Sequence, residues 1–364
     1  MLVCPLDWGL GHASRMIPVI QRFTESGYQI FLGGSGKSGE LLKMTFPELP
    51  YIQIPSTEIR YARDPHWLLL KLICQIPGLI LSAIREHQYV KSIIEKHRIN
   101  ILVSDNRYGL FCRKAYCIFV THQISPVLPP LLKWAEYPLY LMLRIIIGKY
   151  NECWIPDTPH REMNLTGKLS HRFKIPENAK YVGILSRFTS MYDMPIKEPP
   201  EKYELAIILS GPEPHLTILL QSVLALTRKM ERKTIIITGF NTKYPVNSIS
   251  NTMITVVSHL DQHQFYQVIK NAGVIICRSG YSSIMDLIAL QKTAILIPTP
   301  GQTEQIYLAE NLTRMGYFSY LRQDQLDPDI VLNYLNERSF INNCQINSFT
   351  ECLPITGLLN KKNG

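Results

Sequence analysis

The sequence lacks a Cys-x-x-Cys pair, a low-complexity tract and any uninterrupted apolar run of the about 20 residues that a membrane-spanning helix needs. Its longest apolar stretches, residues 67–81 and 139–147, are interrupted by Lys71, Pro77 and Arg144. These absences argue against a zinc ribbon, a disulfide-framed secreted domain, a disordered chain and a transmembrane protein.

Eight cysteines are scattered along the chain, and several lie inside apolar runs. We expect them to be buried free thiols in a reducing compartment. The first apolar run, residues 2–6, is typical of a strand and not of a signal peptide, which also favours a cytoplasmic protein. The cysteines are Cys4, Cys74, Cys112, Cys117, Cys153, Cys277, Cys344 and Cys352.

The chain has 364 residues, more than one hydrophobic core usually serves, so we expect two domains. Its apolar fraction of 46% and charged fraction of 18% are typical of a globular enzyme. The net charge of +9 is uneven: residues 1–185 contain 22 Lys and Arg against 14 Asp and Glu, and residues 186–364 contain 16 against 15. Because the basic residues are dispersed and no nucleic-acid motif is present, we expect no nucleic acid partner.

Short apolar runs alternate with helix-length amphipathic segments through nearly the whole chain. This alternation predicts an α/β fold of two tandem Rossmann-like domains that face each other across a cleft. A proline-rich stretch, residues 191–202, is expected to link them. We expect the domains over residues 1–185 and 186–340, with a tail over 341–364 that packs back on the first domain. The expected strands are residues 2–6, 28–32, 51–54, 101–104, 116–121, 205–209, 234–238, 254–257, 274–277 and 294–297.

Ligands of parallel sheets bind at the carboxyl ends of the strands, so the loops there contain the functional candidates. The first such loop contains Gly9, Gly11, His12 and Arg15, between a strand and an amphipathic helix. Glycines let backbone N–H groups approach a ligand, and a helix N-terminus favours negative charge. The alternative is a tight turn in which His12 helps to cap the helix.

A second loop has the same order of strand, glycine-containing turn and helix, and it can hold a diphosphate. Asp286, about one turn into the helix, can accept hydrogen bonds from a ribose, or it can form a capping box with Ser283, which the spacing alone favours. The residues of this loop that we expect to bind substrate are Arg278, Ser279, Gly280, Ser282 and Asp286.

Two further loops complete the second domain. Glu304 and Gln305 lie at a helix start and can hold the hydroxyl groups of a sugar; alternatively, Thr303 is an N-cap and Glu304 complements the helix dipole. Ser210 and Gly211 follow the first strand of the second domain. Their loop can close over the same ligand, or it is a proline-stiffened turn.

The order of these loops resembles glycosyltransferase family 28, which includes the lipid-linked N-acetylglucosaminyltransferase of peptidoglycan synthesis. The resemblance covers the motif loops and implies the two-domain GT-B fold, with an acceptor domain followed by a nucleotide-sugar donor domain. It rests on the run 277–280, on Asp286, on Pro298 followed by Glu304 and Gln305, and on the Gly9-x-Gly11-His12 loop with Arg15.

The resemblance also implies roles for individual residues. His12 falls where the family has its candidate catalytic residue. The Glu304–Gln305 pair differs from the Gln-Gln pair of family 28, which leaves the donor sugar open. By position, the resemblance implies that the diphosphate of a UDP-sugar binds to Arg278, Ser279 and Gly280. It also implies that the ribose binds to Asp286, and that the donor sugar binds to Glu304 and Gln305.

We expect His12 to be the base of an inverting transfer, because a histidine titrates near neutrality and can take the proton of an acceptor hydroxyl. Asp7 and Asp105 follow strands of the first domain and are candidates to orient His12 or to replace it. Each aspartate has an alternative role as a turn or N-cap residue.

Backbone amides, a helix N-terminus and Arg278 can stabilise the leaving diphosphate without a metal ion. We therefore expect no metal and no cofactor, since the nucleotide-sugar is a co-substrate. The Asp-x-Asp sequence at Asp327 and Asp329 is better explained as an N-cap followed by proline at the first helical position.

Residues 131–149 combine aromatic and aliphatic side chains with Lys133, Arg144 and Lys149. This composition suits a surface that rests on anionic lipid, and it points to an acidic or lipid-linked acceptor at the inner face of the cytoplasmic membrane. The alternative is a core helix with solvated basic ends.

Other functions fit the same loops. UDP-sugar hydrolases of this superfamily also contain a Gly-x-Gly-His-x-x-Arg loop, which residues 9–15 match. A non-catalytic nucleotide-sugar-binding protein would bind the donor without turnover. A 2-epimerase of similar fold fits the Gly-His loop poorly.

Overall fold

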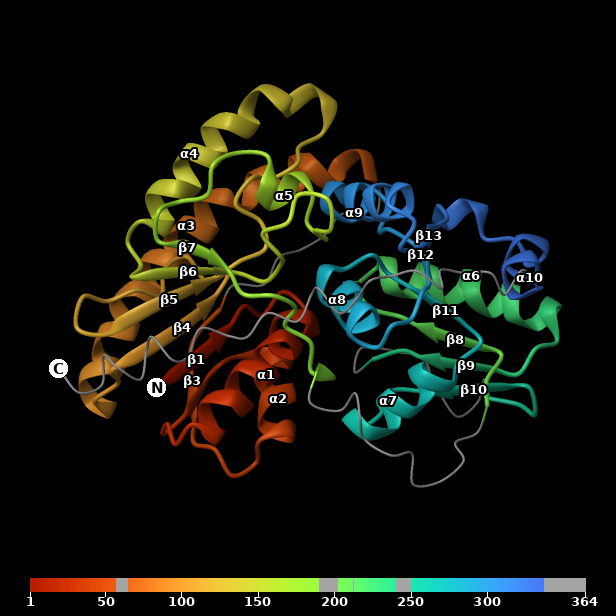
Figure 1. Ribbon diagram of the computed structural model, residues 1–364, viewed down its shortest axis with the longest axis horizontal. Helices are drawn as coiled ribbons and strands as arrows, with labels where there is room; N and C mark the ends of the chain where they lie inside the picture. Colours follow the sequence, from red (N-terminus) through yellow and green to blue (C-terminus); the bar gives the residue numbers. More distant parts are fainter. Residues whose placement is uncertain (57–64, 190–201, 212, 240–249, 337–364) are drawn as a thin grey trace. The chain divides into compact units, whose positions relative to one another are not determined.

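The computed structural model describes residues 1–56, 65–189, 202–211, 213–239 and 250–336, which form two compact units (Figure 1). Of the described residues, the first unit takes in 1–56 and 72–187, and the second takes in 65–71 and those from 188 to 336. The expected tail, 341–364, lies outside the described residues, as does the expected linker apart from Lys202.

The first unit is built on a parallel sheet of seven strands in the order β3-β2-β1-β4-β5-β6-β7 (Figure 1). Pro5 and Asp105, the last residues of β1 and β4, are paired in the sheet register. The strand order reverses between β1 and β4, and doubly wound sheets bind ligands at such a switch point. The strands are β1 (Leu2–Pro5), β2 (Phe31–Gly34), β3 (Tyr51–Gln53), β4 (Ile101–Asp105), β5 (Tyr116–Val120), β6 (Glu152–Ile155) and β7 (Ala179–Tyr181).

Helices cover both faces of this sheet. α1 and α2 pack on one face, and α3 and α4 cover the other (Figure 1). On the latter face Val90 and Ile94 of α3 and Ile147 of α4 pack with strand residues such as Phe119 in one buried cluster. The helices are α1 (Leu10–Glu25), α2 (Gly36–Thr45), α3 (Pro65–His97), η1 (Pro130–Ala135), α4 (Glu136–Ile147) and α5 (Lys168–His171).

The second unit repeats the plan with a parallel sheet of six strands in the order β10-β9-β8-β11-β12-β13. Its switch point lies between β8 and β11, where Ile208 pairs with Cys277. The strands are β8 (Leu205–Ile208), β9 (Thr234–Ile237), β10 (Ile254–Val257), β11 (Val274–Cys277), β12 (Ile295–Leu296) and β13 (Ser319–Tyr320).

The core of the second unit lies between its sheet and two helices. Leu216 and Val223 of α6 and Val331 of α10 pack with Ile207 and Ile236 of the strands. The helices are α6 (His215–Met230), α7 (Gln262–Asn271), α8 (Tyr281–Ala289), α9 (Thr303–Arg314), η4 (Gln323–Gln325) and α10 (Pro328–Asn336).

The expected α/β fold with two parallel sheets is confirmed. Three strands, β6, β7 and β13, were not expected from the sequence, and neither was the single long helix α3. All six described cysteines are free, as expected, and five are buried; Cys74 is exposed. Burial raises the pKa of the Cys277 thiol to about 12, so it is inert near neutrality. None of the helices in the described residues has both the length and the apolar composition that are needed to cross a membrane.

Candidate active site

A histidine and an aspartate meet at the switch point of the first sheet. His12 lies in the first turn of α1, just after the loop that follows β1, and Asp105 ends β4. His12 Nδ1 is 3.2 Å from Asp105 Oδ2. The side chain of His12 is 18% exposed, whereas that of Asp105 is 0% exposed. Of the two aspartates expected to orient His12, the structure therefore brings Asp105 to it.

Arg15, one turn further along α1, is the buried partner of Asp105. Arg15 Nε donates to Asp105 Oδ2 at 2.8 Å, and Arg15 Nη2 donates to Asp105 Oδ1. Burial alone raises the pKa of a carboxyl group, but the positive charge of Arg15 and the contact with His12 outweigh it and hold the pKa of Asp105 below its ordinary value. We expected Arg15 to bind substrate; its guanidinium instead holds Asp105 inside the protein.

Two groups compete for His12 Nδ1. Asp105 Oδ2 accepts its proton in one tautomer, whereas Arg15 Nη2, 2.9 Å away, donates to it in the other. Burial lowers the pKa of His12, and the charge of Asp105 offsets this only in part, so the imidazole is neutral near pH 7. When Nδ1 donates to Asp105, the lone pair of Nε2 can take a proton from a substrate.

Two further residues at this edge were not predicted. His122 follows β5, is buried, and its Nδ1 lies 3.0 Å from Arg15 Nη1. Its position directly after the expected strand 116–121 is the signal that would have found it. Asn106 follows Asp105 with φ of 53°, and its buried Oδ1 makes no hydrogen bond with any described residue. Such left-handed backbone is uncommon outside glycine and is often found at functional sites.

Asp7 supports a helix start. Ser38 N, in the first turn of α2, donates to Asp7 Oδ1 at 3.1 Å. At Gly36 the backbone lies so close to this carboxylate that a Cβ would overlap it. Asp7 therefore stabilises the first turn of α2 without being its N-cap residue, which is Ser35.

The loop that contains Gly9 is held in place by the side chain of Ser38. Ser38 Oγ donates to Leu6 O at 3.0 Å and to Gly9 O at 3.1 Å. Gly9 is the N-cap of α1 with φ of 134°, a conformation that favours glycine, and Gly11 lies in the first turn. A Cβ added at Gly9 would meet no described atom within 4 Å, so the backbone is open there.

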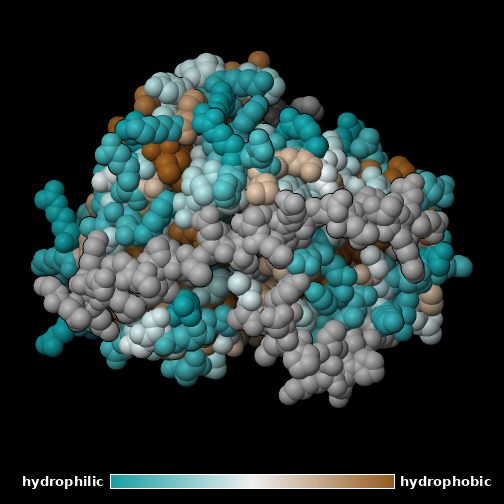
Figure 2. All heavy atoms as spheres, viewed as in Figure 1, coloured by the Kyte–Doolittle hydropathy of each residue, from teal (hydrophilic) through white to brown (hydrophobic). Residues whose placement is uncertain are grey.

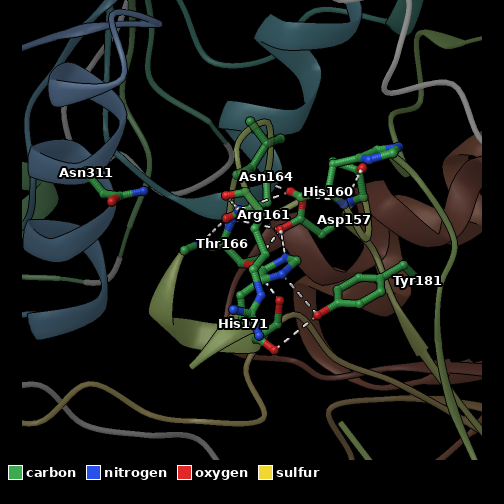
Figure 3. Close-up of polar contacts among 12 residues, drawn as sticks. Asp157, His160, Arg161, Asn164, Thr166, His171, Tyr181 and Asn311 are labelled. Atoms are coloured by element: carbon green, nitrogen blue, oxygen red, sulfur yellow. Dashed lines mark hydrogen bonds and ion pairs between the residues drawn. The ribbon is translucent and has the colours of Figure 1, made fainter. Parts of the chain in front are cut away.

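A second polar network lies in the loop between β6 and β7, around Asp157 (Figure 3). The buried carboxylate of Asp157 accepts from the backbone N–H groups of Leu165 (3.0 Å) and Thr166 (2.8 Å) and from the Thr166 hydroxyl. His171 Nε2 is 3.5 Å from Asp157 Oδ2, and its ring stacks on Tyr181. These contacts fix the loop at the carboxyl end of β6. Sequence reasoning missed it because β6 was not recognised.

In the second unit, Arg278 departs from its expected role. Its side chain is 1% exposed, and Nη1 donates to the backbone oxygens of Ile297 (3.3 Å) and Pro298 (3.1 Å). Nη2 donates to His215 O at 3.1 Å and to Gln323 Oε1 at 3.0 Å. Arg278 therefore ties together the loop after β12, the start of α6 and η4, and oxygens of the protein engage both of its Nη atoms.

The rest of this loop surrounds the start of α8. Ser279 is buried, and its hydroxyl donates to Gln305 O at 2.8 Å. Gly280 is the N-cap of α8, and Ser282 lies in the first turn. The capping box was wrong: Ser283 is the third helical residue and not the N-cap, because the helix begins at Tyr281. Asp286 follows in the next turn and is half-buried.

The expected sugar-binding residues lie at the start of α9. Thr303 is the first helical residue, not the N-cap, and Gln302 precedes it; Glu304 lies in the first turn. Gln305 is buried, and its Oε1 accepts from Thr299 N at 2.8 Å, which leaves its Nε2 for other partners.

At the end of β8, Ser210 and Gly211 are exposed, and Gly211 has φ of 111°. The expected N-cap at Asp327 is confirmed, since α10 begins at Pro328 and Asp327 Oδ1 accepts from Asp329 N at 2.9 Å. Across the described parts of the chain, no three His, Cys, Asp or Glu side chains gather in a way that could hold a metal ion.

Residues 215–347 match the family model of the glycosyltransferase family 28 C-terminal domain. The second unit is therefore similar to the C-terminal domain of family 28. Two bacterial relatives are UDP-N-acetylglucosamine–N-acetylmuramyl-(pentapeptide) pyrophosphoryl-undecaprenol N-acetylglucosamine transferases. The one from Haemophilus influenzae is 37% identical over 65 residues, which is 18% of this chain and 18% of the relative. The one from Clostridium tetani is 33% identical over 88 residues, 22% of this chain and 25% of the relative.

Solved structures extend the similarity to the whole chain. The spinosyn rhamnosyltransferase in complex with spinosyn aglycone has a TM-score of 0.63 at 13% identity and covers 100% of this chain and 99% of its own. MurG of Acinetobacter baumannii has a TM-score of 0.58 at 12% identity, covering 99% of this chain and 98% of its own. These likenesses show that the chain has the two-domain GT-B fold.

Proposed function

We propose that this chain is an inverting glycosyltransferase that moves a sugar from a UDP-sugar to the hydroxyl group of an acceptor. The match to the family 28 C-terminal domain supports a nucleotide-sugar donor, and the names of the bacterial relatives support uridine as its nucleoside. The observation that carries the proposal is the contact of the neutral His12 with Asp105 at the switch point of the first sheet.

In the proposed reaction the acceptor oxygen attacks the anomeric carbon, and its bond forms while the carbon–oxygen bond to the diphosphate breaks. The acceptor proton passes to His12 Nε2, and the electron pair of the broken bond leaves with UDP. The negative charge of Asp105 stabilises the imidazolium, and Arg15 keeps the carboxylate ionised and in place. Attack opposite the leaving group inverts the anomeric configuration.

The leaving diphosphate needs positive potential, which the start of α8 offers. Gly280 is the N-cap of this helix and has no side chain to cap its first turn, and a Cβ added at Gly280 would meet no described atom within 4 Å. Because Arg278 is engaged by backbone oxygens, the backbone amides of this turn take the role first expected of its guanidinium. The proposed transfer requires neither a metal ion nor a cofactor.

The acceptor is proposed to be lipid-linked, because the first unit has an apolar surface that suits a bilayer. We call it the α4 face. Trp134 is 74% exposed and Ile145 is 70% exposed, and exposed Lys133 and Arg144 lie beside them. Brown spheres reach the surface at the upper left of Figure 2, where Figure 1 places α4. The α4 face consists of Leu131, Trp134, Tyr137, Leu141, Met142 and Ile145.

Exposed aromatic and aliphatic side chains with flanking cations are typical of proteins that rest on anionic lipid. The excess of basic residues in positions 1–185 gives this part of the chain a positive charge, which is opposite to the charge of anionic lipid. The proposal therefore places the enzyme peripherally, at the inner face of the cytoplasmic membrane.

Thermal unfolding of the full chain with a panel of nucleotide sugars tests the donor. A UDP-sugar should raise the melting temperature, and the corresponding adenine nucleotide should not. UDP release is then measured with the stabilising donor, with and without a lipid-linked saccharide. Release that needs the acceptor supports transfer. Fast release of free sugar without acceptor would indicate a hydrolase, and binding without release under both conditions would indicate a non-catalytic protein.

A further inference from the structure

Two polar side-chain groups between β12 and α9 are buried without a partner. Thr299 is 0% exposed, and neither its Oγ1 nor Gln302 Oε1 makes a hydrogen bond with any described residue. Burial of an unpaired hydroxyl or amide oxygen costs free energy, so such groups are uncommon unless a ligand or function requires them.

The loop around these groups is otherwise well bonded. Thr299 N donates to Gln305 Oε1 at 2.8 Å, and Gln302 N donates to Thr299 O at 3.0 Å. Ser279 Oγ donates to Gln305 O at 2.8 Å and ties the loop to the neighbouring strand end. The two unpaired groups therefore lie in a fixed frame, and their lack of described partners is not the result of loose packing.

The Thr299 hydroxyl lies near Gly211, in the loop after β8. A Cβ added at Gly211 would lie 4.0 Å from Thr299 Oγ1 and would meet no other described atom at that range. Gly211 has φ of 111°, a backbone conformation that would strain any residue with a side chain. A glycine here leaves the space beside its Cα free of a side chain. A ligand atom that contacts Gly211 there lies within reach of the Thr299 hydroxyl.

The chemistry of the two groups distinguishes the ligand. The Thr299 hydroxyl can donate or accept, but Gln302 Oε1 can only accept. A diphosphate near neutral pH presents acceptors alone and cannot satisfy Gln302. Sugar hydroxyl groups donate and accept, and they can satisfy both.

We infer that Thr299 and Gln302 bind hydroxyl groups of the donor sugar, and so extend the sugar site beyond Glu304 and Gln305. This inference rests on the proposed function, since it needs a nucleotide-sugar donor in the second unit. Thr299 then contributes to the choice of sugar at a cost in the stability of the unliganded protein.

The test compares Thr299→Val and Gln302→Met with the wild-type chain. Affinities for the stabilising UDP-sugar and for UDP are measured by calorimetry, together with the melting temperature without ligand. We expect each variant to bind the UDP-sugar about tenfold more weakly and to bind UDP as the wild type does. Thr299→Val should also raise the melting temperature, because a methyl group replaces an unpaired hydroxyl.

Thr234→Val is the matched control. Thr234 is also buried, but its hydroxyl donates to Arg232 O at 2.8 Å at the amino end of β9. This variant should lose stability and keep both affinities.

The possible outcomes separate the two claims. Unchanged UDP-sugar affinity in Thr299→Val and Gln302→Met overturns the inference alone. An equal loss of UDP affinity shows that the groups bind the nucleotide, through its ribose or its diphosphate, and also overturns the inference, as does a lower melting temperature of Thr299→Val. A wild-type chain that binds neither UDP nor any UDP-sugar overturns the proposed function, and the inference with it.

Discussion

Arg15 Nη1 lies 3.0 Å from His122 Nδ1, and both side chains are buried. A guanidinium can only donate, so His122 must accept at Nδ1 and hold its proton on Nε2. The same guanidinium donates to both oxygens of Asp105 and approaches His12 Nδ1. One arginine from α1 therefore contacts the proposed base and the two groups beside it, and these three residues follow or end three different strands.

Asp105→Asn should destabilise the protein by about 3–5 kcal/mol, because it leaves the buried Arg15 without a counter-charge. Urea unfolding measures this. Glu204→Gln is the control: its pair with Arg232 is nearly half exposed, so the loss should be below about 1 kcal/mol. Replacing Arg15 and Asp105 together by leucine should restore much of the stability. A single Asp105→Asn variant as stable as the wild type would contradict the ion pair.

His12→Ala should lower the transfer rate by about 10²- to 10⁴-fold and keep the affinity for the UDP-sugar donor, because the proposed donor site lies in the second unit and His12 lies in the first. Single-turnover kinetics and calorimetry measure the two effects. His263→Ala, an exposed histidine of α7, is the control and should change neither. Near-normal turnover in His12→Ala would remove His12 from the role of base.

The transfer rate should fall at acid pH, and the midpoint of this fall should lie below pH 6.5, the ordinary pKa of histidine. Burial lowers the pKa of His12 further than the charge of Asp105 raises it, and only neutral His12 can take a proton. Stability should fall in the same window, since the unfolded chain binds a proton at about pH 6.5 before the folded chain does. A His12→Gln variant should lose this part of the stability profile. A fall in the transfer rate that begins above pH 6.5 would mean that the charge of Asp105 raises the pKa of His12 more than burial lowers it.

The proposed base could be predicted from the sequence because two local patterns point to it. One is a glycine turn after a strand, and the other is an aspartate at the end of a second strand. The partners of that base depend on topology. His12 and Asp105 are 93 positions apart and meet only because β4 pairs with β1 on the side away from β2. No local pattern indicates that Arg15 faces inward, since an arginine after a glycine-rich loop is equally typical of a substrate ligand.

Other residues were misjudged for physical reasons of the same kind. β6 was missed because it begins with Glu152, a charged residue that strands rarely bury. Here Lys180, Trp154 and Tyr116 bond its carboxylate, and despite its partial burial they hold the pKa of Glu152 low. The Ser283 capping box failed because the end of β11 sets the helix start three residues earlier than the spacing indicates.

Arg278→Met should destabilise the second unit by about 2–4 kcal/mol, because the backbone oxygens of Ile297, Pro298 and His215 lose a buried donor. Burial lowers the pKa of Arg278 to about 10, so it is still charged at neutral pH. Well below the melting temperature, the variant should bind UDP within about threefold of the wild type. A tenfold loss of UDP affinity in the stable Arg278→Lys variant would instead show a direct contact with the diphosphate.

Trp134→Ser and Ile145→Ser should each weaken binding to phosphatidylglycerol vesicles by about tenfold, since each removes a large apolar side chain that the bilayer would cover. Both side chains are more than two-thirds exposed, so the melting temperature should not change. Met44→Ser is the matched control: Met44 is 58% exposed on α2, which packs on the other face of the sheet. Higher salt should weaken binding of the wild-type chain, because it screens Lys133 and Arg144 from the lipid phosphates. If the Trp134→Ser/Ile145→Ser double variant co-sediments with vesicles as the wild type does, the α4 face is not the lipid-binding surface.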